Sequence, residues 1–501
     1  MKNYKYLFLL IVISILGCSN LEEEPIGLLA PEGFFKAPKD LQTMVNGAYG
    51  HMQHEDFWGR KFSLPIMLRS DMVAIGDPNT AQRRRDHDNF EVADDNGMIT
   101  GSWFRIYRII AAANQAIAGA ELISADDNIK NPITAQAYFV RAFTYFHLVR
   151  LYGDIPYLDK PVTNSIESGE ISKTSAADVY TKIIADLEYA KQWLPDTQPS
   201  RSIPSKATAQ SYLALVHLTL GDYTNAYNEA KEVIQNEVKY ELALDADFQD
   251  LFDATKIDSS KEPLFAIDYN GLRNGDQGTD YQPALTGIRA DERSGNGGGW
   301  SVAVPSLAVY NTWDSRDYRR SVSLDDTGVF GGVEVPYTDF LGKHASIVAR
   351  PHIAKYTRFP GVTAHGNGRA SSHNYSMLRY AEVLLIAAEA LNEISGGSAE
   401  AHDYVNRVRS RARNGSAFPA NVSGLNQTDF RTMVLEERKW ELAFEYKRWY
   451  DIVRRKLGPQ VFGASGLELR PNFSETRDYL LPLPADELQR NPNLLPNNPG
   501  Y

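Results

Sequence analysis

The chain has one long apolar stretch, Ala137 to Tyr157 (AYFVRAFTYFHLVRLYGDIPY), which predicts a helix buried on nearly every side. Its polar side chains occur at intervals of three residues, which places them in one narrow stripe along the helix. Gly153 can adopt the left-handed conformation that ends a helix, and Pro156 prevents the helix from restarting. Other helices must therefore surround this segment. The polar stripe consists of Arg141, Thr144, His147 and Arg150.

Apolar residues recur at helical spacing in several other segments of the chain. Ser102 is placed to cap one of these helices, and Trp103 lies in its first turn. We expect helices over residues 31–52, 102–120, 175–193, 206–237, 377–408 and 429–455.

Two of these segments resemble tetratricopeptide units, which are pairs of helices. Lys206 to Glu237 contains a first helix, the turn Leu220-Gly221-Asp222-Tyr223 and a second helix, and a similar pattern starts at Met377. Each unit has an apolar face that it cannot bury alone, so the units should stack on one another. The sequence therefore predicts a mainly α fold built on a tetratricopeptide-type helical scaffold.

Two regions lack helical periodicity. Residues 55–101 are polar and predict a long loop, and long loops in compact domains usually carry function. Residues 241–374 are rich in Gly, Pro, Asp and Tyr and predict irregular structure with short strands. We expect one domain over 31–501, in which these two regions interrupt a helical scaffold at about 31–54, 102–240 and 375–501.

The N-terminus has the features of an export signal. Lys2 and Lys5 precede an apolar run, Tyr6 to Leu16, that is too short to span a bilayer. The run ends in Ile15-Leu16-Gly17-Cys18, which resembles the lipobox of bacterial lipoproteins. We expect residues 1–17 to be a signal peptide, Cys18 to be lipidated, and residues 18–30 to form a flexible tether.

Charge and cysteine content narrow the functional class further. The net charge of -11 disfavours nucleic acid and anionic lipid surfaces, because neither would be attracted over distance. Cys18 is the single cysteine, so no intrachain disulfide can form.

No motif indicates catalysis. Glu436 to Arg455 interleaves acidic and basic residues at i, i+4 spacing, which is more typical of helix ion pairs than of the two carboxylates of a glycosidase. The glycine patch at 295–299 lacks the Lys-Ser/Thr of a phosphate loop. The aspartates at 245, 247 and 250 lack the glycine that a calcium loop needs, and His87 among acidic neighbours is better explained by a solvated loop than by a metal site. We expect no metal, no cofactor and no catalytic residue.

Four segments, taken together and in this order, resemble the SusD/RagB family of outer-membrane lipoproteins. The resemblance extends from the lipobox to Tyr501. The segments are RAFTYFHLVRLYGDIPY at 141–157, RYAEVLLIAAEALN at 379–392, EERKWELAFEYKRWYDIVR at 436–454 and NPNLLPNNPGY at 491–501.

This resemblance implies a SusD-like protein that captures glycans and is not an enzyme. Its helical scaffold would dock on a SusC-like TonB-dependent transporter of the outer membrane. Its irregular, loop-rich half would bind a polysaccharide or its oligosaccharides on the exposed face.

Sugar binding requires exposed aromatic rings, which pack against the C–H face of a pyranose, and planar polar groups, which bond its hydroxyls. Among the seven tryptophans, Trp300 and Trp313 lie in the irregular insertion and are predicted platforms, with Trp103 joining from the N-terminal side. A core role is the alternative for each, because large aromatic side chains are mostly buried. The candidates for hydrogen bonding are Arg69, Asp71, Asn79, Arg85 and Tyr281.

The glycan itself remains open at this level. Exposed tryptophans and the acidic balance favour a neutral polysaccharide, such as a β-glucan of the laminarin type. The run Arg83-Arg84-Arg85 is the contrary observation, since guanidinium groups pair well with uronate or sulfate. A scaffold that binds peptide or protein partners is the alternative from another class, and a glycoside hydrolase is a third.

Overall fold

The computed structural model describes residues 31–501 except 163, 165–166, 168, 273–277, 295–297 and 363–368. The predicted signal peptide and the predicted lipidation site, Cys18, lie outside the described residues. Within the described part of the chain, no helix is both long enough and apolar enough to cross a membrane.

Most of the secondary structure is helical, as predicted, and this confirms the mainly α fold. The helices are α2 (Pro31–Phe34), α3 (Pro38–Met52), η1 (Glu55–Gly59), α4 (Ser63–Leu68), α5 (Gln82–Asn89), α6 (Gly97–Ala120), α7 (Asp127–Tyr152), α9 (Ala176–Trp193), α10 (Lys206–Leu220), α11 (Tyr223–Gln235), α12 (Gln282–Thr286), α13 (Leu307–Thr312), α14 (Tyr318–Ser323), α15 (Tyr380–Ser395), α16 (Ala399–Ala412), α17 (Gln427–Glu441), α18 (Arg448–Arg454), α19 (Gly458–Val461) and α20 (Ala485–Arg490).

The strands are short and form antiparallel pairs. β1 (Val73–Ile75) pairs with β3 (Ala303–Pro305), and β2 (Pro263–Ile267) pairs with β8 (Tyr375–Arg379). β4 (Leu324–Asp325) pairs with β7 (His352–Ile353), and β5 (Thr327–Phe330) with β6 (Val333–Pro336). Most of them belong to the region 241–374, which is irregular with short strands, as the sequence predicted.

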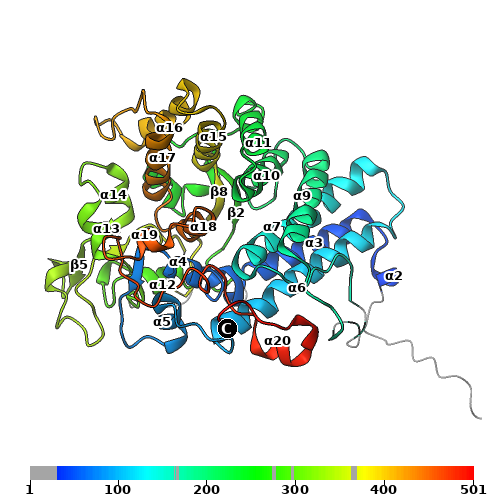
Figure 1. Ribbon diagram of the computed structural model, residues 1–501, viewed down its shortest axis with the longest axis horizontal. Coiled ribbons are helices and arrows are strands. Elements are labelled where there is room, and N and C mark those ends of the chain that lie inside the picture. Colours follow the sequence, from blue (N-terminus) through cyan, green and yellow to red (C-terminus); the bar gives the residue numbers. More distant parts are fainter. Residues whose placement is uncertain are drawn as a thin grey trace, which may run out of the picture.

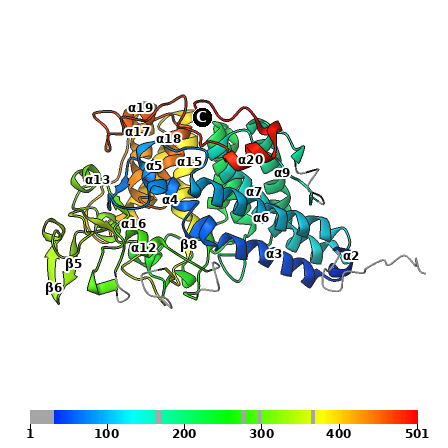
Figure 2. The ribbon, with the colours of Figure 1, turned by 90° about the horizontal axis from the view of Figure 1, so that it is seen from below.

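The helical half and the irregular half lie on opposite sides of the molecule (Figures 1 and 2). α7 packs against α3, α6 and α9, and the series continues through α10 and α11 to α15. α15 then packs against α16 and α17. β5, β6 and α13 lie at the far end from α2 and α3 in both views.

α7 is the buried helix that the apolar stretch predicted. It ends at Gly153, which has a φ of 70° and whose N–H bonds the Val149 carbonyl at 2.9 Å. Its polar stripe is used inside the protein: Arg141 pairs with Asp186 at 2.7 Å, and the His147 Nδ1 lies 2.9 Å from the Tyr450 hydroxyl. The stripe thus joins α7 to α9 and α18.

The predicted start of one helix is wrong. α6 begins at Gly97 and not near Ser102, because Asn96 caps it by accepting the Met98 N–H at 2.9 Å. Ser102 is buried inside the helix, where its hydroxyl donates to the Ile99 carbonyl.

The region 55–101 is not the continuous loop that its polarity predicted. It contains η1, α4, β1 and α5 before α6 starts. α4 is buried along its whole length, from Ser63 to Leu68, so its sequence lacks the one-sided pattern by which amphipathic helices are recognised.

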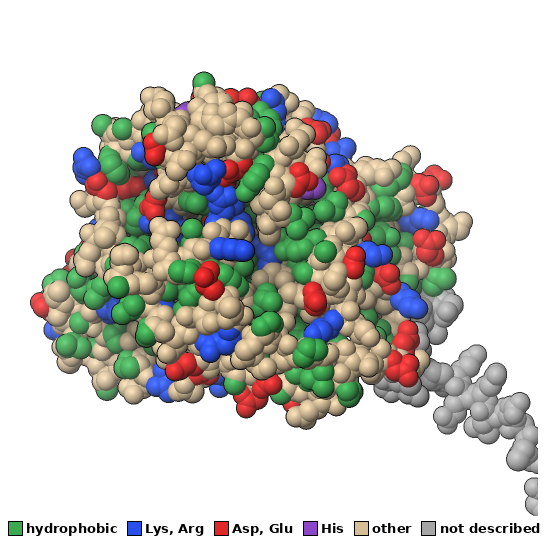
Figure 3. All heavy atoms as spheres, viewed as in Figure 1, with side chains coloured by type: hydrophobic (Ala, Val, Ile, Leu, Met, Phe, Trp, Pro, Cys, Tyr) green, Lys and Arg blue, Asp and Glu red, His purple; other side chains and the backbone are tan. Residues whose placement is uncertain are grey.

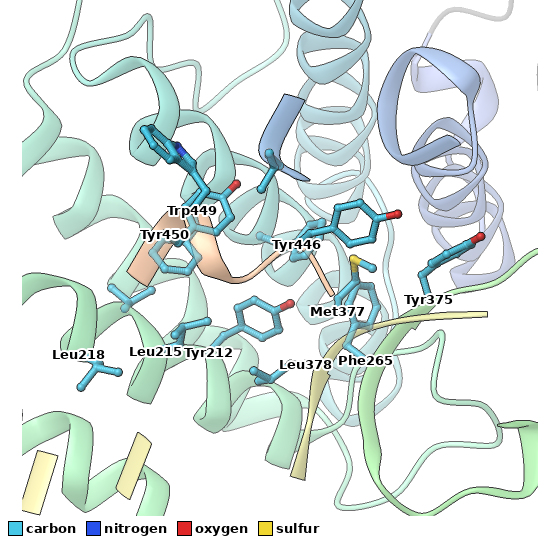
Figure 4. Close-up of a cluster of buried hydrophobic side chains, with 14 of the residues drawn as sticks. Tyr212, Leu215, Leu218, Phe265, Tyr375, Met377, Leu378, Tyr446, Trp449 and Tyr450 are labelled. Carbon is cyan, nitrogen blue, oxygen red and sulfur yellow. The ribbon is translucent and has the colours of Figure 1, made fainter. Parts of the chain in front are cut away.

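The helix predicted over 429–455 is broken. α17 ends at Glu441, α18 starts at Arg448, and both Phe444 and Tyr446 between them have φ above 60°. This turn directs Tyr446 into the core, where it lies near Tyr212, Met377 and Phe265 at the meeting point of α10, β2 and β8 (Figure 4). Tertiary packing therefore overrides the local helical pattern here.

Candidate functional site

The pairing of β1 with β3 brings together two segments that are far apart in the sequence. Beyond the strands, Gly76 N–H bonds the Val302 carbonyl at 2.9 Å and Asp77 N–H bonds the Ser301 carbonyl at 2.7 Å. A third segment joins them through the bond from Tyr281 N–H to the Gly59 carbonyl, at 3.0 Å. Backbone hydrogen bonds thus hold the loops around Trp300 in place.

Trp300 is partly exposed and is surrounded by an aromatic ring and guanidinium groups. The centroid of the Tyr281 ring is 5.5 Å from that of Trp300. The guanidinium carbons of Arg84 and Arg369 lie 5.8 and 5.3 Å from the Trp300 ring centroid. Arg60 lies over Tyr281 at 4.4 Å. We call this group of Tyr281, Trp300, Arg60, Arg84 and Arg369 the Trp300 site.

The guanidinium groups of the Trp300 site have few protein partners. The Nε atoms of Arg60, Arg84 and Arg369 are buried and have no hydrogen-bond partner in the described structure. Arg60 forms an ion pair with Glu55, and Arg84 donates from Nη1 to the Thr80 hydroxyl at 2.9 Å. Loss of hydration lowers the pKa of Arg60 to about 10, and the nearby positive charges of Arg84 and Arg369 act in the same direction.

Arg289 positions the backbone of Trp300. Its Nη2 donates to the Asp77 carboxylate at 2.9 Å and to the Trp300 carbonyl at 2.7 Å. No sequence pattern marks Arg60, Arg289 or Arg369, which are isolated arginines in regions without a pattern. Arg84 belongs to the run Arg83-Arg84-Arg85, whose guanidinium groups suit anionic ligands.

Half of the residues predicted for the site lie on segments that meet here. Trp300 and Tyr281 are in contact. Asn79 and Arg85 lie on the 76–85 segment, where Asn79 N–H bonds the Asp77 carboxylate and Arg85 bonds the Pro78 carbonyl, both at 2.9 Å. The Asn79 side chain is exposed.

Trp313 and Trp103 lie elsewhere, and the expectation that their rings are exposed is wrong. Trp313 is 3% exposed because Trp440 of α17 stacks on it, with ring centroids 4.7 Å apart. Trp103 is 4% exposed and packs against Tyr107 and Tyr152. It lies at the inner wall of a separate groove between α6 and α20.

Arg69 and Asp71 are buried structural residues in this fold. The Arg69 guanidinium lies 4.7 Å from the ring centroids of both Phe90 and Trp449. Asp71 accepts two hydrogen bonds from Arg448, each at 2.8 Å. Neither is available to bond a sugar hydroxyl in this structure.

The charged C-terminal helices carry ion pairs. Figure 3 shows Lys and Arg side chains gathered at a hollow in the middle of one face, near α17 and α18. The cationic residues that line this hollow all face carboxylates: Arg431 and Arg455 pair with Glu393, Lys439 with Glu436 and Arg448 with Asp71. Each cation of the hollow therefore has a carboxylate partner within the protein.

No metal-binding group emerges from the described residues, among which no cluster of three or more His, Cys, Asp or Glu side chains could hold an ion. His87, which the sequence placed in a solvated loop, is fully buried in α5. Its neighbour Asp88 pairs with Arg470 at 2.6 Å.

The fold and the candidate site define a mainly helical protein that presents an aromatic and cationic surface on its irregular half. Comparison with known proteins agrees with this class. Residues 343–501 match the SusD family, and residues 21–218 match a family described as starch-binding and associating with the outer membrane. SusD-like protein P2 of Formosa agariphila is 57% identical over the full length of both chains.

The chain therefore belongs to the SusD-like family of glycan-binding proteins, and membership places it at the outer membrane. Solved structures share the fold at lower identity. A SusD homologue from Bacteroides thetaiotaomicron is 20% identical with a TM-score of 0.82, covering 94% of this chain and 98% of that one. Surface glycan-binding protein A from Bacteroides thetaiotaomicron, in complex with laminarihexaose, is 21% identical with a TM-score of 0.76, covering 92% and 99%.

Proposed function

We propose that this protein binds a polysaccharide or its oligosaccharides at the cell surface through the Trp300 site and passes them, uncleaved, to a partner TonB-dependent transporter. The observation that carries the proposal is the partly exposed Trp300 ring, held by backbone bonds and bordered by Tyr281. Cys18 anchors the protein by its lipid, residues 18–30 form the tether, and residues 31–501 form the binding domain.

A partly exposed indole ring that is bordered by planar polar groups is well suited to bind a sugar. The flat face of an indole packs against the C–H groups of a pyranose, and planar donors at its border bond the hydroxyls. Because β1–β3 pairing and Arg289 fix the loops, little ordering is needed when the ligand binds. The peptide-scaffold alternative has no use for such a ring in the irregular half.

Trp300 is expected to contribute about 1–3 kcal/mol to glycan binding, as stacking aromatic rings do. The test is native affinity electrophoresis of the protein without residues 1–18, in gels that contain single polysaccharides. Trp300→Ala should abolish most of the retardation. Trp193→Ala is the matched control, because Trp193 is also partly exposed but lies at the end of α9.

Equal retardation of Trp300→Ala and the unaltered protein would remove Trp300 from the site. Incubation with a retained polysaccharide should release no reducing sugar, and release would contradict binding without cleavage. Laminarin is one polymer to include, because the structure of a protein with this fold was solved in complex with laminarihexaose.

A further inference from the structure

The protein normally neutralises the arginines that it buries. Arg379 contacts Glu262, Glu441 and Glu445, and Arg454 contacts Glu389 and Asp451. Arg319, Arg411 and Arg438 are held by carboxylates in the same way. Such pairing is needed because a guanidinium that leaves water without a counter-charge is strongly destabilised.

Two arginines of the Trp300 site, Arg84 and Arg369, do not follow this rule. Arg69 is a further exception among the described residues, but it is enclosed between the Phe90 and Trp449 rings. Arg84 is 9% exposed, yet within the described residues it has no carboxylate within 4.0 Å, and its Nε has no partner. Arg369 likewise forms no ion pair with any described carboxylate, and its Nε is buried without a partner. Both guanidinium groups lie beside the Trp300 ring.

The nearby carboxylates are committed to other partners. Asp77 pairs with Arg289 at 2.9 Å, and Asp291 pairs with Arg293 at 2.7 Å. Glu55 pairs with Arg60, the one cation of the Trp300 site that has an anionic partner among the described residues. The surface next to Trp300 therefore carries positive charge that no carboxylate of the described residues compensates.

We propose that the ligand of the Trp300 site is an anionic glycan, a polysaccharide with sulfate ester or uronate groups whose charge is bound by Arg84 and Arg369 while Trp300 packs against a sugar ring. This inference rests on the proposed function and specifies its substrate class. Guanidinium groups match sulfate and carboxylate oxygens with paired N–H donors. A neutral glucan offers hydroxyls and no counter-charge.

The protein as a whole does not attract such a polymer, because its net charge is -11. Recognition is therefore local and depends on the few cations beside Trp300. Since surface charge is screened by salt, binding should weaken as ionic strength rises.

The experiment compares gels that contain laminarin, which is neutral, alginate, which carries uronate only, and carrageenan, which carries sulfate only. We expect retardation by alginate, carrageenan or both, and little by laminarin; which of the two retards identifies the anionic group. Arg369→Gln and Arg84→Gln should weaken binding of the retarding polymer by about tenfold or more, as loss of a charged hydrogen bond does.

Two further variants make the result specific. Arg369→Lys keeps the charge but loses the paired donors, so its affinity should fall between those of Arg369→Gln and the unaltered protein. Arg316→Gln is the matched control. Arg316 is exposed and forms its ion pair with Asp314, and its guanidinium lies over the Phe418 ring and not beside Trp300. Thermal unfolding of each variant shows whether it is folded. If Arg84→Gln is not folded, the result for Arg369→Gln decides the question.

The outcomes separate this inference from the proposed function. Retardation by laminarin alone that Trp300→Ala abolishes would retain glycan binding and overturn the anionic ligand. Unchanged binding of alginate and carrageenan by Arg369→Gln would also overturn it. No retardation in any gel would contradict the proposed function itself.

Discussion

At the scale of single residues, a neighbouring element decides whether a side chain meets solvent. Trp300 and Trp313 both lie in the irregular half, and the sequence predicted both as exposed platforms. Trp440 of α17 stacks on Trp313 and buries it. Trp300 contacts Tyr281 at one side and stays partly exposed. The same indole side chain is therefore buried at one position and partly exposed at the other.

His352 lies next to the site and should make stability depend on pH. Its Nδ1 lies 2.9 Å from the Arg350 carbonyl and its Nε2 lies 2.8 Å from the Ser301 hydroxyl. Because burial disfavours the charged ring, the pKa of His352 falls to about 3, from an ordinary value of 6.5. Below about pH 6.5 the unfolded chain therefore binds a proton that the folded protein does not.

We expect the unfolding free energy to fall as pH drops from about 6.5 toward 3, by about 1.4 kcal/mol per pH unit for this group. His352→Asn removes the titration. Urea unfolding at about pH 7 and about pH 5 should show the unaltered protein losing about 2 kcal/mol more than the variant. Equal losses in both proteins would show that His352 is not the source.

At the scale of elements, local patterns specify the helices and their ends. Gly221 has a φ of 75° and ends α10 in the tetratricopeptide-like unit, as its sequence predicted. Ser175 caps α9 by accepting the Asp178 N–H at 3.2 Å. Such interactions involve residues only a few positions apart, so they can be predicted from the sequence without knowledge of the fold.

The end of α18 combines a Schellman motif with an unusual residue. Leu457 N–H bonds the Ile452 carbonyl at 2.9 Å and Lys456 N–H bonds the Val453 carbonyl at 3.2 Å. The left-handed position of this motif, usually glycine, is Lys456, with a φ of 51°. This side chain is exposed, so it contributes little packing there.

Lys456→Gly should therefore stabilise the protein by about 1 kcal/mol, because glycine adopts the left-handed conformation without steric strain. The measurement is the midpoint of urea unfolding. Lys456→Ala is the control and should bring no gain, since alanine keeps the strained Cβ. A gain for alanine equal to that for glycine would point to the charge and not the backbone.

At the scale of the whole molecule, a buried network of charges ties the irregular half to the scaffold. Glu441 of α17 accepts from Arg379 at the end of β8 at 2.6 Å and from Arg319 of α14 at 3.0 Å. Arg411 of α16 is its third partner. These arginines hold the pKa of Glu441 well below its usual range.

Glu441→Gln should lower the unfolding free energy by about 3–5 kcal/mol, because it leaves buried guanidinium charges without their counter-charge. Glu436→Gln on the same helix is the control. Glu436 is 52% exposed and pairs only with Lys439, so its loss should cost little. Equal effects of the two substitutions on urea unfolding would show that the network contributes no more than a surface pair.

The sequence by itself determined the helical scaffold, its repeat-like units and the irregular insertion, because each depends on residues close together in the chain. It also singled out Trp300 and Tyr281, which the structure places in contact, and the run that contains Arg84. The sequence did not predict the break between α17 and α18, because Phe444 and Tyr446 are buried by contacts with residues from other segments.

Only the tertiary structure decided which candidates form one site. β1 and β3 pair residues such as Val73 and Pro305, far apart in the chain, and that pairing sets Arg84 beside Trp300. The tertiary structure also stacks Trp440 on Trp313, which buries it, and places Arg369 beside Trp300 from a segment without a sequence pattern. Contacts over such separations leave no local periodicity, so burial and charge at the site follow from the fold alone.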